Sequence, residues 1–106
     1  MADEINFDGY SIVNTGGISL PVTSILVSGQ PVLADNCVII VSSTTVPAGG
    51  VILVPLPSAS SNQGKVLILK NDHPNLAFTA VGFGDIDSET IKYIISDGSS
   101  WIDISP

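Results

Sequence analysis

Arginine is absent from this chain, and charged side chains of any kind are scarce. They account for 12% of the 106 residues, with three lysines against ten acidic residues and a net charge of −7 at pH 7. Nucleic-acid binding depends on cationic side chains that neutralise phosphates, so this charge balance argues against direct DNA or RNA binding. An anionic membrane surface would likewise repel the chain.

Long unbroken apolar segments are also missing. No charged residue occurs in Gly9–Ala34 or between Asp35 and Lys65, but glycine and proline interrupt both stretches. Neither provides the roughly 20 consecutive apolar residues of a membrane helix, so we expect no membrane insertion. The acidic start has no cationic segment before an apolar run, which argues against a secretory signal. Cys37 is the single cysteine, which excludes an intrachain disulfide and suits synthesis in a reducing cytosol.

Branched apolar residues are what the chain has in excess. Isoleucine, valine and leucine make up 33 of its 106 residues. A chain of 10.9 kDa forms one domain and keeps about 5,600 Å² of accessible surface as a monomer. Because charged side chains are too few to cover that surface, we expect part of it to be buried against other copies in a symmetric oligomer.

The apolar residues come in short runs separated by Gly, Pro, Asn, Asp and Ser, which is typical of strands and turns. This pattern predicts an all-β fold, a compact antiparallel sandwich or barrel or a prism-like module. The expected strands are Ser11–Val13, Ile18–Val27, Cys37–Val41, Val51–Val54, Lys65–Lys70, Leu76–Val81, Thr90–Ile95 and Trp101–Ile104. The last two flank Asp97-Gly98, a residue pair that favours a tight hairpin turn.

Three of the runs are apolar at every position, whereas a strand with one solvated face alternates apolar and polar residues. They are Cys37–Val41, Val51–Val54 and Val66–Leu69. We expect a neighbouring subunit to cover their second face; a tight two-sheet monomer with short central strands is the alternative. The expected oligomer core consists of Ile39, Val41, Leu53, Ile68 and Trp101.

From Cys37 onward, short motifs follow one another in a fixed order over about two-thirds of the chain. They are the strand Cys37–Val41, the pair Leu56-Pro57, the segment Lys70-Asn71-Asp72, the segment Gly84-Asp-Ile-Asp87 and the hairpin Ser96-Asp-Gly-Ser-Ser-Trp101. This ordered set resembles the small β-rich trimeric module of bacteriophage tail fibres, tailspikes and other virion surface proteins.

The resemblance implies a homotrimer on a virion, with capsid or tail proteins as partners and synthesis in the host cytoplasm. Because the chain runs from Met1 to Pro106, we expect a free-standing copy, a decoration protein or a short spike. Residues 35–106 would be the trimerising module, and residues 1–34 an N-terminal hairpin or attachment arm. The residues expected to attach it to the particle are Ile18, Leu20, Ile25 and Val27.

Catalytic chemistry has few residues to draw on. His73 is the only histidine and lies in a turn-rich segment, and no arginine is present to hold an anion. We therefore expect neither an enzyme nor a cofactor. Asp85, Asp87 and Glu89 have the spacing of oxygen ligands for a cation, and three copies of His73 could meet on a threefold axis. A solvated acidic turn and a loop histidine are the favoured interpretations.

Two alternative functions involve sugars: a glycan-binding tip of a phage tail fibre, and a cellular carbohydrate-binding β-module. The candidate contacts are Tyr10, Tyr93, Trp101 and Asp103. Trp101 and Asp103 lie two residues apart on one strand, so they share a face, and an aromatic ring beside a carboxylate suits sugar recognition. Against this, a tryptophan in a small β-fold commonly fills the core, and we favour that role for Trp101.

Overall fold

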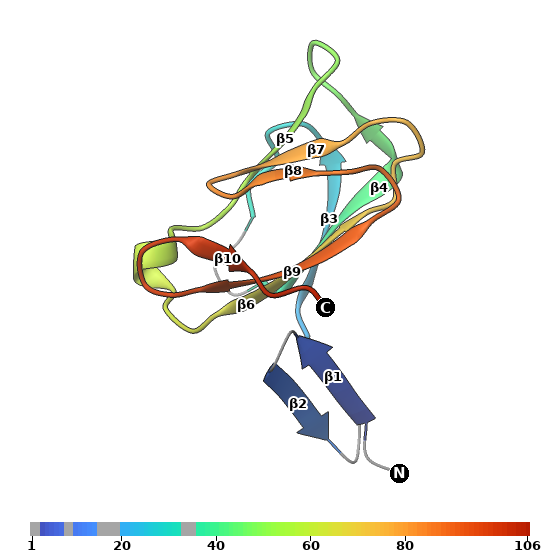
Figure 1. Ribbon diagram of the computed structural model, residues 1–106. Coiled ribbons are helices and arrows are strands. Elements are labelled where there is room, and N and C mark those ends of the chain that lie inside the picture. The colour runs from blue at the N-terminus through green and yellow to red at the C-terminus, as the bar shows by residue number, and fades with distance from the viewer. Residues whose placement is uncertain (1–2, 8–9, 15–19, 33–35) are drawn as a thin grey trace.

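The computed structural model describes residues 3–7, 10–14, 20–32 and 36–106, with side chains from residue 20 onward. Apart from one short 3-10 helix, the regular elements of this described part are β-strands (Figure 1). Its elements are β1 (Asp3–Phe7), β2 (Tyr10–Asn14), β3 (Val22–Val27), β4 (Val38–Val46), β5 (Ile52–Pro55), the short 3-10 helix η1 (Ala59–Ser61), β6 (Val66–Asn71), β7 (Phe78–Val81), β8 (Gly84–Ile86), β9 (Ile91–Ser96) and β10 (Trp101–Asp103). None of these described elements is a helix of the length and apolarity needed to cross a bilayer.

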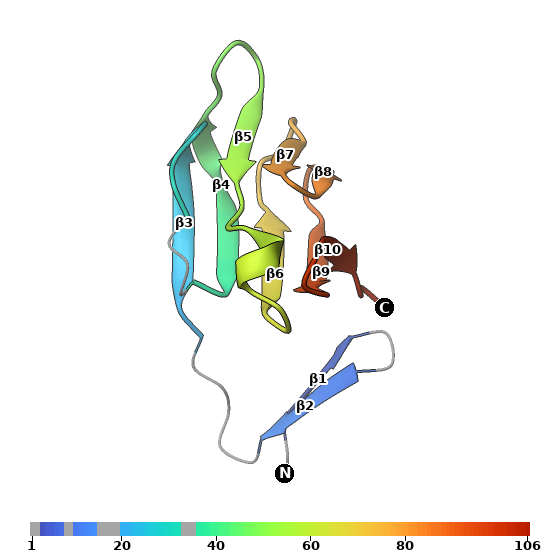
Figure 2. The ribbon, with the colours of Figure 1, turned by 90° about the vertical axis from the view of Figure 1, so that its left-hand side faces the viewer.

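Two sheets enclose the core. A five-stranded sheet has the order β10-β9-β6-β4-β3, and a three-stranded sheet has the order β5-β7-β8 (Figures 1 and 2). The inward-facing residues of both sheets form one buried cluster, in which each fully buried aliphatic side chain stabilises the fold by about 1.5–3 kcal/mol. Its members are Ile25, Ile39, Val41, Ile52, Val54, Leu67, Leu69, Phe78, Ala80, Ile86, Ile94 and Trp101. The expectation of a compact all-β fold is confirmed.

The chain winds alternately through the two sheets, from β4 to β5, then to β6 and then to β7. Consequently β4 pairs with β6 and β5 with β7 in parallel, and β3 also pairs with β4 in parallel. The expectation of an antiparallel fold is therefore wrong for these three pairs. Each strand is separated from its neighbour by an excursion into the opposite sheet, so it re-enters in the same direction. Fully apolar runs are typical of such parallel strands.

In the last part of the chain the strand pairings are antiparallel. β8 pairs antiparallel with β7, β9 returns antiparallel to β6, and β10 pairs with β9. The expected C-terminal hairpin around Asp97-Gly98 is confirmed: Gly98 has a positive φ of 95°, which a residue with a side chain adopts only with strain.

The expected boundary at residue 34 falls inside the two-sheet unit and needs correction. β3 pairs with β4, and Ile25 on β3 is fully buried. The chain then continues to the edge of the other sheet, where the Gly29 amide donates to the Leu53 carbonyl at 2.7 Å and the Leu53 amide donates to Ser28 Oγ at 2.9 Å. Among the described residues, those of the antiparallel hairpin of β1 and β2 stand apart from the two sheets (Figures 1 and 2).

Candidate functional site

The face of the five-stranded sheet that is turned away from the three-stranded sheet is apolar; we call it the outer face. Strand register places Val22 beside Val38, Val38 beside Ile68 and Ile68 beside Tyr93, so one apolar row crosses four strands. Every residue of the outer face is at least partly exposed. Its apolar members are Val22, Val38, Ile40, Val66, Ile68, Ile91, Tyr93, Ile95 and Ile102. Contiguous exposed apolar surfaces are common at interaction sites of proteins.

Charge is almost excluded from the outer face. Among the strand residues of the five-stranded sheet, Lys70 is the one charged residue on this side, in register with Ile40 and Ile91. Its ammonium lies 3.5 Å from the carboxylate of Asp72, just beyond the end of β6. Lys92 and the carboxylate of β10 belong to the opposite face by register. In a chain of net charge −7, the outer face is thus neutral to weakly basic.

A second exposed apolar group, which we call the apolar tip, lies where β3, β4 and β5 come together. Its members are Leu26, Val27, Val46, Val51 and Leu53, each between 43% and 58% exposed. Val46 is the last residue of β4, and Val51 bridges Ala48 in the turn that projects between β4 and β5 (Figure 1). Gly49 and Gly50 both have positive φ there, 61° and 78°, as the tightest two-residue hairpin turns require. All five residues of the tip are uncharged.

The five residues expected in the oligomer core are divided by the structure. Ile39 and Val41 are fully buried and Trp101 is 7% exposed, so the subunit itself covers all three and none is free to meet another copy. Leu53 is exposed at the apolar tip, and Ile68 lies on the outer face. Successive side chains of a strand point to opposite faces of the sheet. Where every position is apolar, the sequence does not show which alternate residues point into the core, so this strand phase could not be predicted.

Trp101 is also unsuited to sugar stacking, because its ring is buried and its indole N–H donates to the Pro57 carbonyl at 3.1 Å. The carboxylate of Asp103 accepts hydrogen bonds from the Ser105 amide at 2.8 Å and from Lys92 at 3.2 Å. Partial burial acts to raise the pKa of Asp103, but the bonds from Ser105 and Lys92 outweigh it and leave the pKa below its ordinary value. Tyr93 lies on the outer face, and the side chain of Tyr10 lies outside the described part.

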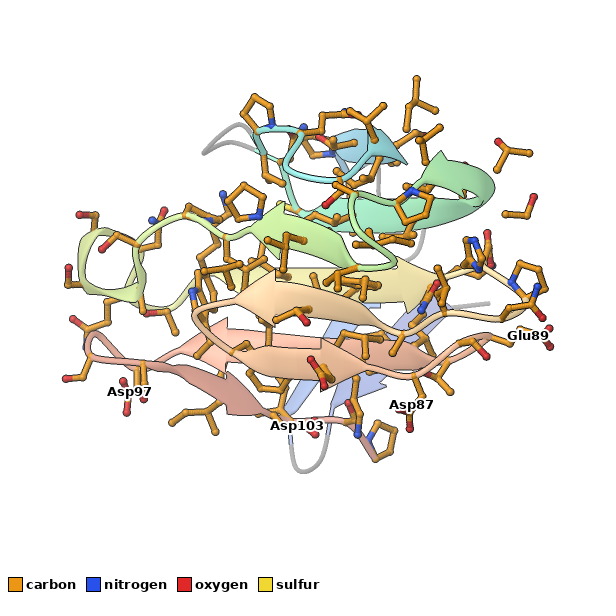
Figure 3. The ribbon with its side chains drawn as sticks, turned by 90° about the horizontal axis from the view of Figure 1, so that it is seen from above. Asp87, Glu89, Asp97 and Asp103 are labelled. Carbon is orange, nitrogen blue, oxygen red and sulfur yellow. The ribbon has the colours of Figure 1, made fainter. Side chains whose placement is uncertain are left out.

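The acidic residues considered as cation ligands are not brought together. The carboxylate of Asp85 accepts a hydrogen bond from the Thr79 hydroxyl at 2.8 Å. The backbone carbonyl of Asp87 accepts a hydrogen bond from the Thr90 hydroxyl at 2.7 Å. Figure 3 shows Asp87 and Glu89 at one end of the molecule and Asp97 at the other, pointing away from the sheets. Among the described residues, no group of three or more His, Cys, Asp or Glu side chains is placed to hold a metal ion.

His73 stabilises a turn. Its Nδ1 accepts the backbone N–H groups of Asn75 at 3.2 Å and Leu76 at 3.1 Å, so the imidazole fixes the path of the chain between β6 and β7. The predicted loop position of His73 is confirmed, and the hydrogen bonds give the side chain a structural task.

Asn71 has a structural role that the sequence analysis, which named it only as part of the Lys70-Asn71-Asp72 segment, did not identify. It is fully buried, and its amide nitrogen donates to the carbonyls of Leu76 at 2.9 Å and Ile86 at 3.1 Å. Its side-chain oxygen accepts from the His73 amide at 2.9 Å. The sequence does contain a signal for this role, because Asn71 continues the alternate, inward-facing positions of Leu67 and Leu69. A buried amide at such a position needs hydrogen-bond partners within the core.

Asp97 holds the turn between β9 and β10. Its carboxylate accepts the backbone N–H groups of Ser100 at 2.9 Å and Ser99 at 2.8 Å. These bonds stabilise the charged form and lower the pKa of Asp97 below its ordinary value. The bonds made by Asn71, Asp97 and Trp101 thus connect neighbouring segments of the fold.

Of the residues expected to attach the chain to a particle, Val27 belongs to the apolar tip and Leu20 is half-buried. Ile25 is part of the core and is therefore not available for attachment, and Ile18 lies outside the described residues.

The structure thus defines a two-sheet β-module whose polar motif residues serve the fold and whose exposed surface carries two apolar areas. No protein family, curated protein or solved structure matches the chain.

Proposed function

We propose that this chain is a structural protein of a virus particle, a homotrimeric decoration protein or short spike that acts by packing and attachment and not by catalysis. The basis is the ordered set of motifs, which resembles the virion module, together with what those motifs do in this fold. The buried amide of Asn71, the indole of Trp101 and the carboxylate of Asp97 all bind the backbone of neighbouring segments. Such residues build a scaffold; they do not form a reactive centre.

The observation that carries the proposal is the outer face. Nine apolar residues on five strands share it with a single charged residue, Lys70. Covering such a face with further copies removes apolar area from water at about 25 cal/mol per Å². The low charge of the chain, 12% of residues, fits a protein whose working state buries much of its surface.

Two apolar areas allow a division of tasks. The outer face belongs to packing between copies, and the apolar tip, at the far end of the molecule from the β1–β2 hairpin (Figure 1), belongs to attachment. Val27, expected to attach the chain, is one of the tip residues.

The experiment is a mass measurement by light scattering at micromolar concentration, followed by binding to virus particles that lack the protein. The proposal expects about three times the chain mass of 10.9 kDa and saturable retention on the particles. A mass of one chain would overturn the oligomer, and a trimer that does not bind particles but is retained on a glycan surface would favour the receptor-tip alternative.

A further inference from the structure

The turn between β9 and β10 contains a chemically reactive pair, Asp97-Gly98. In an Asp-Gly sequence the glycine nitrogen can attack Cγ of the aspartate, because glycine has no side chain to obstruct the approach. The N–Cγ bond forms, the hydroxyl of the protonated carboxyl group leaves with the proton of the nitrogen as water, and a succinimide ring results. Water then opens the ring, and when the bond between the main-chain carbonyl carbon and the nitrogen breaks, the product is isoaspartate. One water is released and one is consumed, so the reaction needs no oxidant or reductant.

The fold requires glycine in this pair. Gly98 has a φ of 95°, and a Cβ atom added there would lie 3.1 Å from Cδ of Gln63, closer than side-chain carbons normally approach. A larger residue would slow the attack but would strain the turn. Asp97 is exposed at one end of the molecule (Figure 3), so the water that opens the ring has access to it. The reactive pair is therefore a built-in feature of this hairpin.

The attacking nitrogen is engaged in another bond while the hairpin is folded. The Gly98 N–H donates to Ser96 Oγ at 3.1 Å. Ser96 is 2% exposed, and its own hydroxyl proton is donated to the Ala59 carbonyl at 2.6 Å. This second bond orients the hydroxyl so that its oxygen is available to Gly98. The nitrogen must give up the bond to Ser96 before it can attack.

The carboxyl group is engaged as well. Its Oδ1 accepts the backbone N–H groups of Ser100 at 2.9 Å and Ser99 at 2.8 Å, and the Asp97 amide donates to the Ser100 carbonyl at 3.1 Å. The bonds from Ser100 and Ser99 favour the charged form and lower the pKa of Asp97. A carboxylate is a poorer target for a nucleophile than the protonated acid. Both reacting groups are thus held in other bonds while the turn is closed.

We propose that Asp97-Gly98 is a modification site, at which isoaspartate forms spontaneously when the turn opens, and that the Ser96 hydroxyl suppresses the reaction in the folded chain. The site lies within one chain, so it does not depend on the proposed self-association. Isoaspartate adds one carbon to the backbone and moves the carboxylate, so the two amide bonds to the carboxylate would be lost. The register that places Trp101 beside Ser96 would shift with them. Modification therefore loosens the C-terminal hairpin.

Isoaspartate is measured by mass spectrometry in the full chain, kept folded or unfolded in guanidinium chloride at neutral pH. Cleavage after Lys92 releases residues 93–106, in which the two isomers have equal mass and are separated by chromatography. The second Asp-Gly pair of the sequence, Asp8-Gly9, lies in another peptide and is the internal reference for the unfolded chain. We expect isoaspartate at Asp97 to form at least about tenfold more slowly in the folded chain than in the unfolded chain. Equal rates in the two states would overturn the inference.

Two serine variants test the part played by the hydroxyl. Ser96→Ala should raise the rate in the folded chain by about fivefold or more, because the Gly98 nitrogen loses its hydrogen bond. Ser100→Ala is the matched control, since it keeps the backbone amide that binds Asp97, and it should change the rate by less than about twofold. Equal rates for the two variants would show that the Ser96 hydroxyl does not suppress the reaction.

Two further measurements separate a local effect from a general loss of stability. Trp101→Phe weakens the same hairpin through the bond to Pro57 and leaves the Ser96–Gly98 bond in place. If it speeds isomerisation as much as Ser96→Ala, the whole fold protects the site and the role of Ser96 is wrong. Hydrogen exchange of the Gly98 amide needs no substitution: we expect slow exchange in the folded chain, and exchange as fast as in the unfolded chain would contradict the restraint by Ser96.

Discussion

The indole nitrogen of Trp101 lies 3.1 Å from the carbonyl oxygen of Pro57, a residue 44 positions earlier in the chain. The bond ties β10 to the segment between β5 and η1, and the ring fills the end of the core with 7% of its surface exposed. Close by, Ser96 Oγ donates a hydrogen bond at 2.6 Å to the carbonyl of Ala59, the first residue of η1, so the C-terminal hairpin is bonded to this part of the chain at two points. The short motifs Leu56-Pro57 and Ser96–Trp101 are therefore in contact in the folded protein.

Trp101→Phe should lower the free energy of unfolding by about 1–3 kcal/mol, because it leaves the Pro57 carbonyl without its partner and removes part of the ring. Trp101→Ala should cost about 3–5 kcal/mol. Urea unfolding followed by far-UV circular dichroism measures both. Val81→Ala, at a 48% exposed position on the three-stranded sheet and away from the outer face, is the control and should be close to neutral. A Phe variant as stable as the parent chain would show that the bond to Pro57 contributes nothing.

Asn71→Leu keeps the approximate size of a buried side chain and removes its hydrogen bonds. The carbonyls of Leu76 and Ile86 and the His73 amide would lose their partners, so we expect a loss of about 3 kcal/mol or more in unfolding free energy. The exposed Asn75, four residues later, provides the matched control, and Asn75→Leu should change stability far less. Equal effects of the two substitutions would contradict the structural role assigned to Asn71.

The sequence predicted the strands far better than their arrangement. Every expected strand overlaps an observed one, because β-branched runs bounded by Gly, Pro and Asn are a local signal. β8 was predicted to be a turn, because the sequence Gly84-Asp-Ile is typical of turns. Its pairing with β7 depends on tertiary contacts, which the local sequence does not show. The parallel pairings were missed for a related reason: a parallel partner is brought in by a long excursion of the chain, which leaves no mark in the strand itself.

The candidate surface was predicted in kind and missed in detail. Unbroken apolar strands indicated a second covered face, and the structure supplies an exposed apolar face on two of the three, β4 and β6; the third run, Val51–Val54, lies in the other sheet. Which residues occupy it is decided by strand phase: Ile39 turns inward and Ile40 outward, although the two are chemically identical. Asn71 shows the converse, because one polar residue in phase with Leu67 and Leu69 identifies the inward side. With that phase known, the register assigns the rest of the sheet.

The turn at Asp97 should make stability depend on pH. Its pKa is lowered in the folded protein by the N–H groups of Ser100 and Ser99, and in the unfolded chain it is about 3.9. The contribution to stability is therefore fully present above the unfolded value and is lost as the pH falls through the folded value. Asp97→Asn should destabilise the protein at neutral pH, and its deficit relative to the parent should shrink as the pH falls below the unfolded value, as urea unfolding at several pH values would measure. A deficit that is the same at every pH would show that the charge is not the cause.

Gln30 protects the open edge of the five-stranded sheet. Its side-chain oxygen accepts from the Leu26 amide at 2.8 Å and its nitrogen donates to the Ser24 carbonyl at 2.9 Å. A residue on a parallel partner strand would make the same two bonds, so the amide occupies the place of a further strand on β3. Gln30→Ala should therefore speed aggregation, measured by thioflavin fluorescence during agitation, with little change in the folded spectrum. Gln63→Ala is the control, and equal aggregation rates for the two variants would show that Gln30 does not guard the edge.

The last prediction separates attachment from packing. Val46, in the apolar tip, is 58% exposed, so Val46→Asp should leave the subunit folded and the oligomer intact. If the tip attaches the chain to its particle, the new carboxylate would have to be desolvated on binding, and affinity should fall by about tenfold or more. Ser43→Asp adds the same charge at an exposed position on the same strand, away from the tip residues, and should bind nearly as well as the parent. Because the tip is uncharged, binding of the parent chain should weaken little as salt rises from low to physiological ionic strength. Co-sedimentation with particles measures the affinities, and light scattering measures the oligomer. A steep salt dependence, or a Val46→Asp chain that binds like the parent, would move attachment to another surface.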